Sequence, residues 1–159
     1  MVLFKISVWP TCANTEPNPA YKPLTDVLLN EGEFMVNRTK VALQTIEEFK
    51  HIIRFNVDSI KAVIPVGKPL TEIVVESKFA DDIQSSQLKL VKLKEYYDKK
   101  EKETLYGLTY EDVVKDTVQP REVETSRNKI TKIVFTVKEK GIYSLCDFSK
   151  KKAILFKID

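Results

Sequence analysis

Apolar and polar residues alternate along much of this chain, most clearly over residues 130–159. Ile133, Phe135 and Val137 fall on one side of a pleat, and the alternation resumes over 142–148 and again over 154–158. Because side chains of a strand point to opposite faces in turn, each run can offer one apolar face to a core while its other face stays wetter. The polar turns at 138–141 and 149–152 are short, which favours antiparallel pairing. The sequence therefore predicts a C-terminal three-strand meander.

Further strands are expected earlier in the chain. Residues 2–9 alternate in the same way, and residues 26–29 and 33–43 form a predicted hairpin around a turn that contains Gly32. Residues 60–66 and 71–79 are two more apolar runs, close enough in sequence to pair directly. Pro65 pushes the first of these runs toward a sheet edge or a strand end, because proline cannot donate to a ladder.

Helical signals occur at three places. Thr45 followed by Glu48 has the spacing of a capping box, and Ile46, Phe49, Ile52 and Ile53 would then form one buried stripe, so a helix is expected near 46–55.

A second helix is expected within 87–104, where Leu90, Leu93 and Tyr97 have helical spacing. A strand that turns at 98–103 and returns is the alternative there. Thr109 and Asp112 repeat the capping signal before a short helix near 110–116. Strand-like runs outnumber these helices and do not alternate with them, so the expected fold is α+β, mostly antiparallel sheet with two or three short helices.

Residues 10–23 interrupt the periodicity with four prolines. Proline removes backbone donors and biases the preceding residue toward extended geometry, so this stretch is expected to be a loop or an arm. Aperiodic segments of this length are often functional or mobile, and the arm is a candidate for contact with a protein partner or for self-assembly. Packing against its own domain is the alternative.

Composition indicates a globular chain. With 159 residues, 43% apolar and 31% charged, it fits a single domain spanning 1–159. Its four glycines lie too far apart in the sequence to form a glycine-rich phosphate-binding loop.

The charge is uneven along the chain. From Arg127 onward nine Lys or Arg oppose three acids, giving +6, so the preceding residues carry −3 of the total +3. A basic C-terminal sheet, with Lys150, Lys151 and Lys152 at one turn, is a candidate for sequence-independent nucleic-acid binding. The alternative is that these lysines keep the sheet soluble and discourage edge-to-edge pairing.

Cysteine usage bears on the compartment. Cys12 and Cys146 lie far apart, with no second cysteine near either, which excludes a metal site of the CxxC type. The first apolar run contains Lys5 and is too short for a signal peptide, so a reducing compartment is expected: cytoplasmic or virion, and not secreted. No run approaches the length that a membrane span requires, and no membrane association is expected.

One enzyme hypothesis comes with a predicted arrangement of side chains. It rests on Glu76 and Lys78, which follow the apolar residues 73–75 and share one side of an extended strand. A carboxylate there can hold a divalent metal while the ammonium polarises a phosphate or an attacking water. Asp58 could supply a second ligand and Glu47 a third. This order of residues resembles the core of restriction-endonuclease-like nucleases, and the resemblance implies catalytic Glu76 and Lys78, metal-binding Asp58 and Glu76, and Mg²⁺ or Mn²⁺ as cofactor. Solvated charges at a strand end are the alternative.

Other candidates for chemistry are weaker. His51, the one histidine, would sit at the margin of the predicted helix's apolar stripe, and nothing local to Cys12 would lower its thiol pKa. A cluster of lysines and tyrosines could stack bases and meet phosphates, or form a charged face with its tyrosines anchored in the core. Its members are Lys92, Lys94, Tyr96, Tyr97, Lys99 and Lys100.

With no cofactor motif and no convincing catalytic set, the expected function is a non-catalytic structural or protein-interaction module. A small subunit of a larger assembly, such as a virion connector or tail component, is the form we expect. A metal-dependent nuclease and a sequence-independent nucleic-acid binder are the alternatives.

Overall fold

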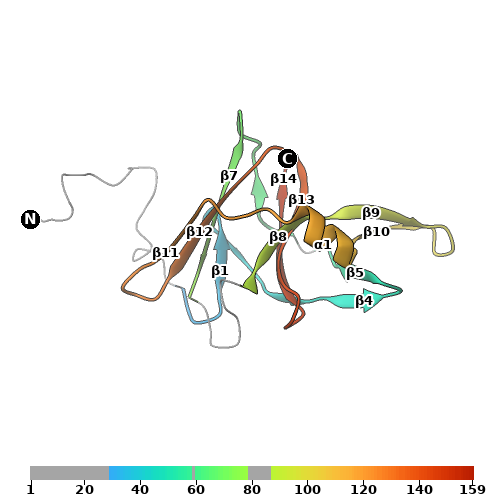
Figure 1. Cartoon of the computed structure of the whole chain (residues 1–159), viewed down its shortest axis with the longest axis horizontal. Helices are drawn as coiled ribbons and strands as arrows, with labels where there is room; N and C mark the ends of the chain where they lie inside the picture. The colour runs from blue at the N-terminus through green and yellow to red at the C-terminus, as the bar shows by residue number, and fades with distance from the viewer. Residues whose placement is uncertain (1–28, 59, 79–86) are drawn as a thin grey trace, which may run out of the picture.

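The computed structural model describes residues 29–58, 60–78 and 87–159. Of these residues 53% lie in strands and 7% are helical, in three antiparallel sheets with one helix (Figure 1). The α+β prediction with two or three helices is therefore wrong, and the described chain is mostly β. The strand expected at 2–9 and the arm expected at 10–23 lie outside the described residues.

The first sheet has the strand order β11-β12-β7-β1-β2. Its strands are β1 (Phe34–Val36), β2 (Thr39–Val41), β7 (Thr71–Ser77), β11 (Glu122–Thr125) and β12 (Thr131–Val137). The predicted continuous strand over 33–43 is wrong, because Asn37 and Arg38 take positive φ values of 43° and 70° and turn the chain back on itself. The Asn37 side chain donates to the Glu72 carbonyl at 3.2 Å and accepts from the Val74 amide at 2.7 Å, which fixes this turn against β7.

The second sheet has the order β3-β14-β13-β8, with β6 added in parallel to β14. Its strands are β3 (Gln44–Thr45), β6 (Val63–Ile64), β8 (Lys89–Lys92), β13 (Gly141–Asp147) and β14 (Lys152–Ile158). All three C-terminal strands form, and β13 pairs with β14, but β12 joins the first sheet, so they are not one meander. The direct pairing expected between 60–66 and 71–79 is also wrong, since β6 pairs with β14 and β7 with β1 and β12.

The third sheet, in the order β4-β5-β10-β9, replaces the helix predicted near 46–55. Its strands are β4 (Glu47–Phe49), β5 (Ile52–Phe55), β9 (Lys94–Asp98) and β10 (Glu103–Leu108). Lys50 and His51 have φ values of 50° and 69° and make a two-residue turn between β4 and β5. The residues of the supposed capping box instead have distant partners: the Thr45 hydroxyl accepts from Lys152 Nζ at 3.1 Å and Glu48 Oε1 accepts from the Tyr110 hydroxyl at 3.0 Å.

The helix predicted within 87–104 is also absent, and this stretch forms β8, β9 and the start of β10, close to the alternative of a strand that turns and returns. Leu90 and Val91 are both buried because they point into different cores. The helix expected at 110–116 is present as α1 (Tyr110–Asp116). Thr109 is its N-cap, and the Thr109 and Asp112 side chains form the reciprocal capping box.

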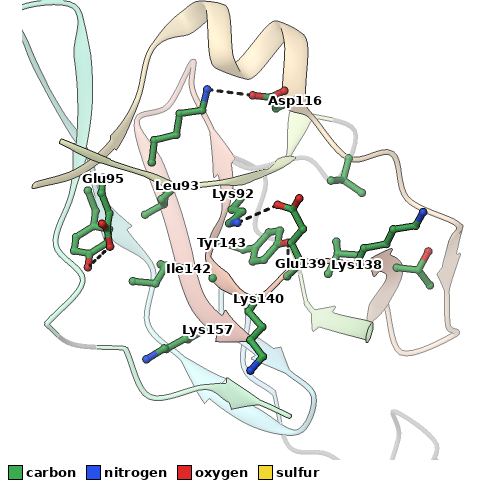
Figure 2. Close-up of a pocket in the computed structure, with 16 residues that line it drawn as sticks. Lys92, Leu93, Glu95, Asp116, Lys138, Glu139, Lys140, Ile142, Tyr143 and Lys157 are labelled. Carbon is green, nitrogen blue, oxygen red and sulfur yellow. Dashed lines mark hydrogen bonds and ion pairs between the residues drawn. The ribbon is translucent and has the colours of Figure 1, made fainter. Parts of the chain in front are cut away.

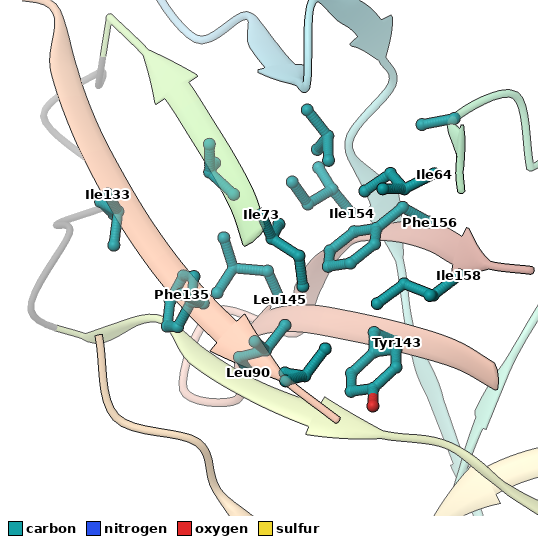
Figure 3. Packing of buried hydrophobic residues seen from close by; sticks show 14 of the residues in the cluster. Ile64, Ile73, Leu90, Ile133, Phe135, Tyr143, Leu145, Ile154, Phe156 and Ile158 are labelled. Atoms are coloured by element: carbon teal, nitrogen blue, oxygen red, sulfur yellow. The ribbon is translucent and has the colours of Figure 1, made fainter. Parts of the chain in front are cut away.

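The second sheet is the middle layer of the molecule (Figure 1). One of its faces packs on the first sheet, where Ile73 and Phe135 meet Leu145, Ile154 and Phe156 (Figure 3). The other face packs on the third sheet and α1 through a second cluster. That cluster consists of Ile46, Ile53, Phe55, Val91, Leu93, Leu108, Val113, Cys146, Ala153 and Leu155.

Strands of a middle layer are buried on both faces, so the expectation that β13 and β14 keep a wetter face is wrong. Tyr143 and Leu145 show this directly, because they point to the face opposite Ser144 and Cys146 and all four residues are buried.

Candidate functional site

A groove of about 960 Å³ opens where the chain passes from β8 into β9 and the loop between β12 and β13 folds over it (Figure 2). At Leu93 the strand leaves the middle sheet, whose last contact is the Leu93 amide donating to the Ile142 carbonyl at 2.8 Å. From Lys94 onward the same chain pairs with β10 in the third sheet. The groove is thus a consequence of two sheets diverging from one continuous segment.

The groove is lined by more cations than anions. Its charged lining residues are Lys92, Lys94, Lys138, Lys140 and Lys157, opposed by Glu95, Asp116 and Glu139. Each carboxylate has a partner: Glu139 lies 3.0 Å from Lys92 Nζ, Asp116 lies 3.5 Å from Lys94 Nζ, and Glu95 accepts from the Tyr106 hydroxyl at 3.1 Å. Within the described chain neither Lys138 nor Lys140 makes an ion pair, so the loop presents uncompensated positive charge.

The base of the groove is packed tightly. Tyr143 is buried, stacks on Phe156 with ring centroids 5.9 Å apart, and donates its hydroxyl to the Glu139 carbonyl at 2.8 Å, which ties the loop to the core. Burial raises the pKa of Tyr143 to about 12, and the nearby Glu139 charge adds to this, so its hydroxyl stays protonated.

Gly141 lets the lysine loop close against β8. Its φ is 141°, a value that favours glycine, and a Cβ placed there would meet Lys92 Cε at 2.5 Å. The Lys92 stem therefore crosses the Gly141 backbone on its way to Glu139.

Beside the groove, Asp112 anchors α1 to β9. Lys94 Nζ lies 2.6 Å from its Oδ1, while Oδ2 accepts from the Thr109 amide at 2.9 Å and from the Tyr96 hydroxyl at 3.3 Å. Burial alone would raise the pKa of Asp112, but the hydrogen bonds from Lys94 and Thr109 outweigh it and lower the pKa to about 2. The same contact with Asp112 raises the pKa of Lys94. This group is a structural anchor, since every one of these polar atoms is engaged by another.

The residues of the nuclease prediction lie in different layers. Glu76 is in β7 of the first sheet with only 2% of its surface exposed, opposite Lys132 of β12, so it is not a solvated strand end. Lys78 is half-buried just beyond that strand. Asp58 is exposed beyond β5, and with Glu47 it lines a separate hollow beside the third sheet.

Over residues 29–58, 60–78 and 87–159, no three carboxylate, histidine or cysteine side chains gather in a way that could hold a metal ion. The nuclease stays a prediction, with Mg²⁺ or Mn²⁺ as its cofactor.

The minor candidates are placed as follows. His51 is exposed in the turn between β4 and β5, not on a helix. Cys12 lies outside the described residues. Cys146 is buried in the middle sheet, and burial, with a smaller contribution from the Asp147 charge, raises its thiol pKa to about 12, so it is not a thiolate at neutral pH.

The lysine and tyrosine cluster of residues 92–100 is divided by strand geometry. Tyr96 is half-buried against Asp112, whereas Tyr97 points to the other face of β9 and is 63% exposed. The cluster is therefore not a single stacking platform.

The C-terminal lysines are also divided. Lys150, Lys151 and Lys152 lie at the turn between β13 and β14, while Lys138, Lys140 and Lys157 lie at the opposite end of that hairpin, by the groove. Sequence reasoning treated the lysines of 138–141 only as a turn. The signal that could have marked them was the pair of lysines around Glu139, with a glycine directly after them.

Comparison of this chain with protein-family models, with curated proteins and with solved structures finds no match. The class that the structure itself defines is a layered, predominantly antiparallel β protein with a lysine-lined groove. Within the described ranges, no helix has the length and apolar character needed to cross a membrane.

Proposed function

We propose that this protein is a non-catalytic structural subunit that interacts with other protein chains as a small component of a larger assembly. The observation that carries the proposal is the third sheet, whose two hairpins, β4–β5 and β9–β10, extend away from the body (Figure 1). In β10 only residues 106–108 pair with β5, so the outer part of the β9–β10 hairpin has no further strand beside it in the described chain.

Two aromatic side chains on this sheet support a role in contact. Tyr97 is 63% exposed near the end of β9, and Phe49 is 53% exposed at the end of β4, where Lys50 and Arg54 lie within cation–π distance of its ring. Because β4 and β9 are the outer strands of their sheet, they also present unpaired backbone groups. Exposed edges next to aromatic rings are suited to packing against another chain.

The partner that we propose is a second copy of this chain. Residues 98–103, at the end of the β9–β10 hairpin, hold three lysines and three acids, so this tip carries no net charge that would repel another copy. A hairpin that docks on a different face of its neighbour makes a head-to-tail contact, and such contacts generate rings when the rotation closes. We propose that the protein is a virion connector or tail component and that it is located in the cytoplasm or in the virion.

Light scattering after gel filtration tests this proposal. We expect a mass above the 18.3 kDa of one chain that rises with concentration, and a reduced mass for the double variant Phe49→Ser/Tyr97→Ser. Val123→Ser is the matched control, because Val123 is also an exposed apolar residue but lies on β11 of the first sheet. Closed rings in negative-stain micrographs would support the connector form.

A strict monomer at high protein concentration, unchanged by deleting residues 10–23, would count heavily against the proposal. If that deletion dissociates the assembly and the hairpin variant does not, the contact belongs to the arm and not to the third sheet.

A further inference from the structure

We propose that the lysine-lined groove binds the phosphate backbone of a single-stranded nucleic acid without sequence preference. This goes beyond the structural role above and rests on different residues, so either proposal can fail alone. The groove lies between β8–β9 and the loop of residues 138–140 (Figure 2).

The charge of the lysine loop is set by a local arrangement. Lys92 crosses Gly141 and holds Glu139, the one acid of the loop, in an ion pair of 3.0 Å. With Glu139 compensated, Lys138 and Lys140 on either side of it remain as exposed ammonium groups. Lys157 adds a third cation, since its pair with Asp159 is long, at 3.8 Å, and exposed.

The chemistry of these cations favours a backbone ligand. An ammonium is a strongly hydrated point charge, whereas bidentate recognition of one phosphate or carboxylate needs the planar guanidinium of arginine, and no arginine lines this groove. In Figure 2 the lysine side chains spread out from the groove instead of converging on one point. They are suited to several phosphates of an extended chain, each of which they would neutralise with release of a counterion.

The groove is less suited to an acidic peptide. A peptide in an extended conformation gains most when it adds to a free strand edge. However, β13 is paired on both sides by β14 and β8, and β12 is paired by β7 throughout and lacks a second strand beside it in the described chain over residues 135–137. The strands that carry the lysine loop therefore offer a free edge of about three residues, which is short for strand addition. A volume of about 960 Å³ with the Tyr106 ring in its lining leaves room for bases beside the phosphates.

The test is fluorescence anisotropy of a labelled 20-nucleotide oligo-dT with the full chain. Three lysine contacts on a single strand give a salt slope of about −2, so we expect affinity to fall roughly 20-fold between 50 and 200 mM salt. The double variant Lys138→Glu/Lys140→Glu should lose at least about 10-fold in affinity at 50 mM salt and show a slope that is shallower by about 1.4.

The matched control is Lys150→Glu/Lys151→Glu. It makes the same change of net charge in two exposed lysines at the opposite end of the β13–β14 hairpin, and we expect its affinity to stay within about 3-fold of the wild type. All four positions are exposed, and equal melting temperatures of the two variants would confirm that both fold.

Three results would overturn the proposal. Absence of binding at 50 mM salt excludes a nucleic-acid ligand. Equal losses in the two variants show that net charge, and not the groove, holds the strand. Displacement of the oligonucleotide by poly-glutamate at an equal concentration of charge shows that the groove takes an acidic polypeptide instead.

Discussion

Replacement of Asp112 by asparagine tests the anchor between α1 and β9. The substitution keeps the size of the side chain but removes the charge that faces Lys94 at 2.6 Å. A carboxyl whose pKa falls from 3.8 to about 2 on folding stabilises the folded state by about 2.5 kcal/mol at neutral pH. Since the Lys94 side chain is half exposed, water screens the pair, and we expect Asp112→Asn to lower the free energy of unfolding by about 1 to 2 kcal/mol.

Asp116→Asn is the matched control for this prediction. Asp116 lies on the same helix and pairs with the same Lys94, but at 3.5 Å and with a side chain that is 42% exposed. Exposed ion pairs contribute little, so we expect a change of less than about 0.5 kcal/mol. Urea unfolding followed by far-ultraviolet circular dichroism, extrapolated to zero denaturant, measures both variants.

The pH dependence separates the charge of Asp112 from its packing. Because folding lowers the pKa of Asp112, its contribution is fully present above its ordinary pKa of 3.8 and is lost as pH falls through about 2. The difference between wild type and Asp112→Asn should therefore be constant from pH 7 to pH 5 and shrink between pH 4 and pH 2. Equal losses for Asp112→Asn and Asp116→Asn, or a loss that persists undiminished at pH 2, would refute this reasoning.

Two further predictions concern Gly141 and the nuclease alternative. Gly141→Ala should lower the free energy of unfolding by about 1 to 2 kcal/mol, because its φ of 141° is strained for any residue with a Cβ; a neutral result in urea unfolding would contradict this. If Glu76, Lys78 and Asp58 form a metal site, the wild type should cut DNA or RNA with Mg²⁺ or Mn²⁺, EDTA should abolish cutting, and Lys78→Ala should lose activity while it stays folded. No cutting by the wild type with either ion would end the nuclease prediction, and since Glu76 is buried, Glu76→Ala requires a folding control.

The two proposals place function at neighbouring parts of the molecule. The third sheet extends away from the body, and the groove opens where β9 departs from the middle sheet. Lys94 and Asp112 connect these regions, because they fix the direction in which β9 leaves the body. A loss of the Asp112 anchor should therefore be checked for effects on both oligomeric mass and oligonucleotide binding.

Local sequence by itself determined the positions of the C-terminal strands and of α1. Apolar and polar residues alternate over 131–137, 141–147 and 152–158, which is enough to predict strands there. Side chains of an extended backbone alternate between two faces with a period of two residues, whereas those of a helix do not. The cap of α1 is equally local, since Thr109 and Asp112 are three residues apart and bond to each other's backbone amides.

The same spacing failed at Thr45 and Glu48, where tertiary structure overrode it. These two side chains are engaged by Lys152 and Tyr110, which are distant in sequence, and the chain between Phe49 and Ile52 turns through two positive φ values instead of continuing as a helix. A capping box and a short hairpin can share one sequence, and only the long-range partners decide between them.

Strand pairing and the groove were decided by tertiary structure alone. Nothing within residues 130–159 says that β12 pairs with β7 while β13 pairs with β8, because the two faces of the middle sheet are buried by residues far away in the chain. The lysine loop gains its uncompensated charge in the same way, since Lys92 reaches Glu139 across 47 positions of sequence. Periodicity determines which residues are extended. The pairing of strands and the formation of ion pairs depend instead on contacts between residues that are distant in sequence, which a local pattern does not predict.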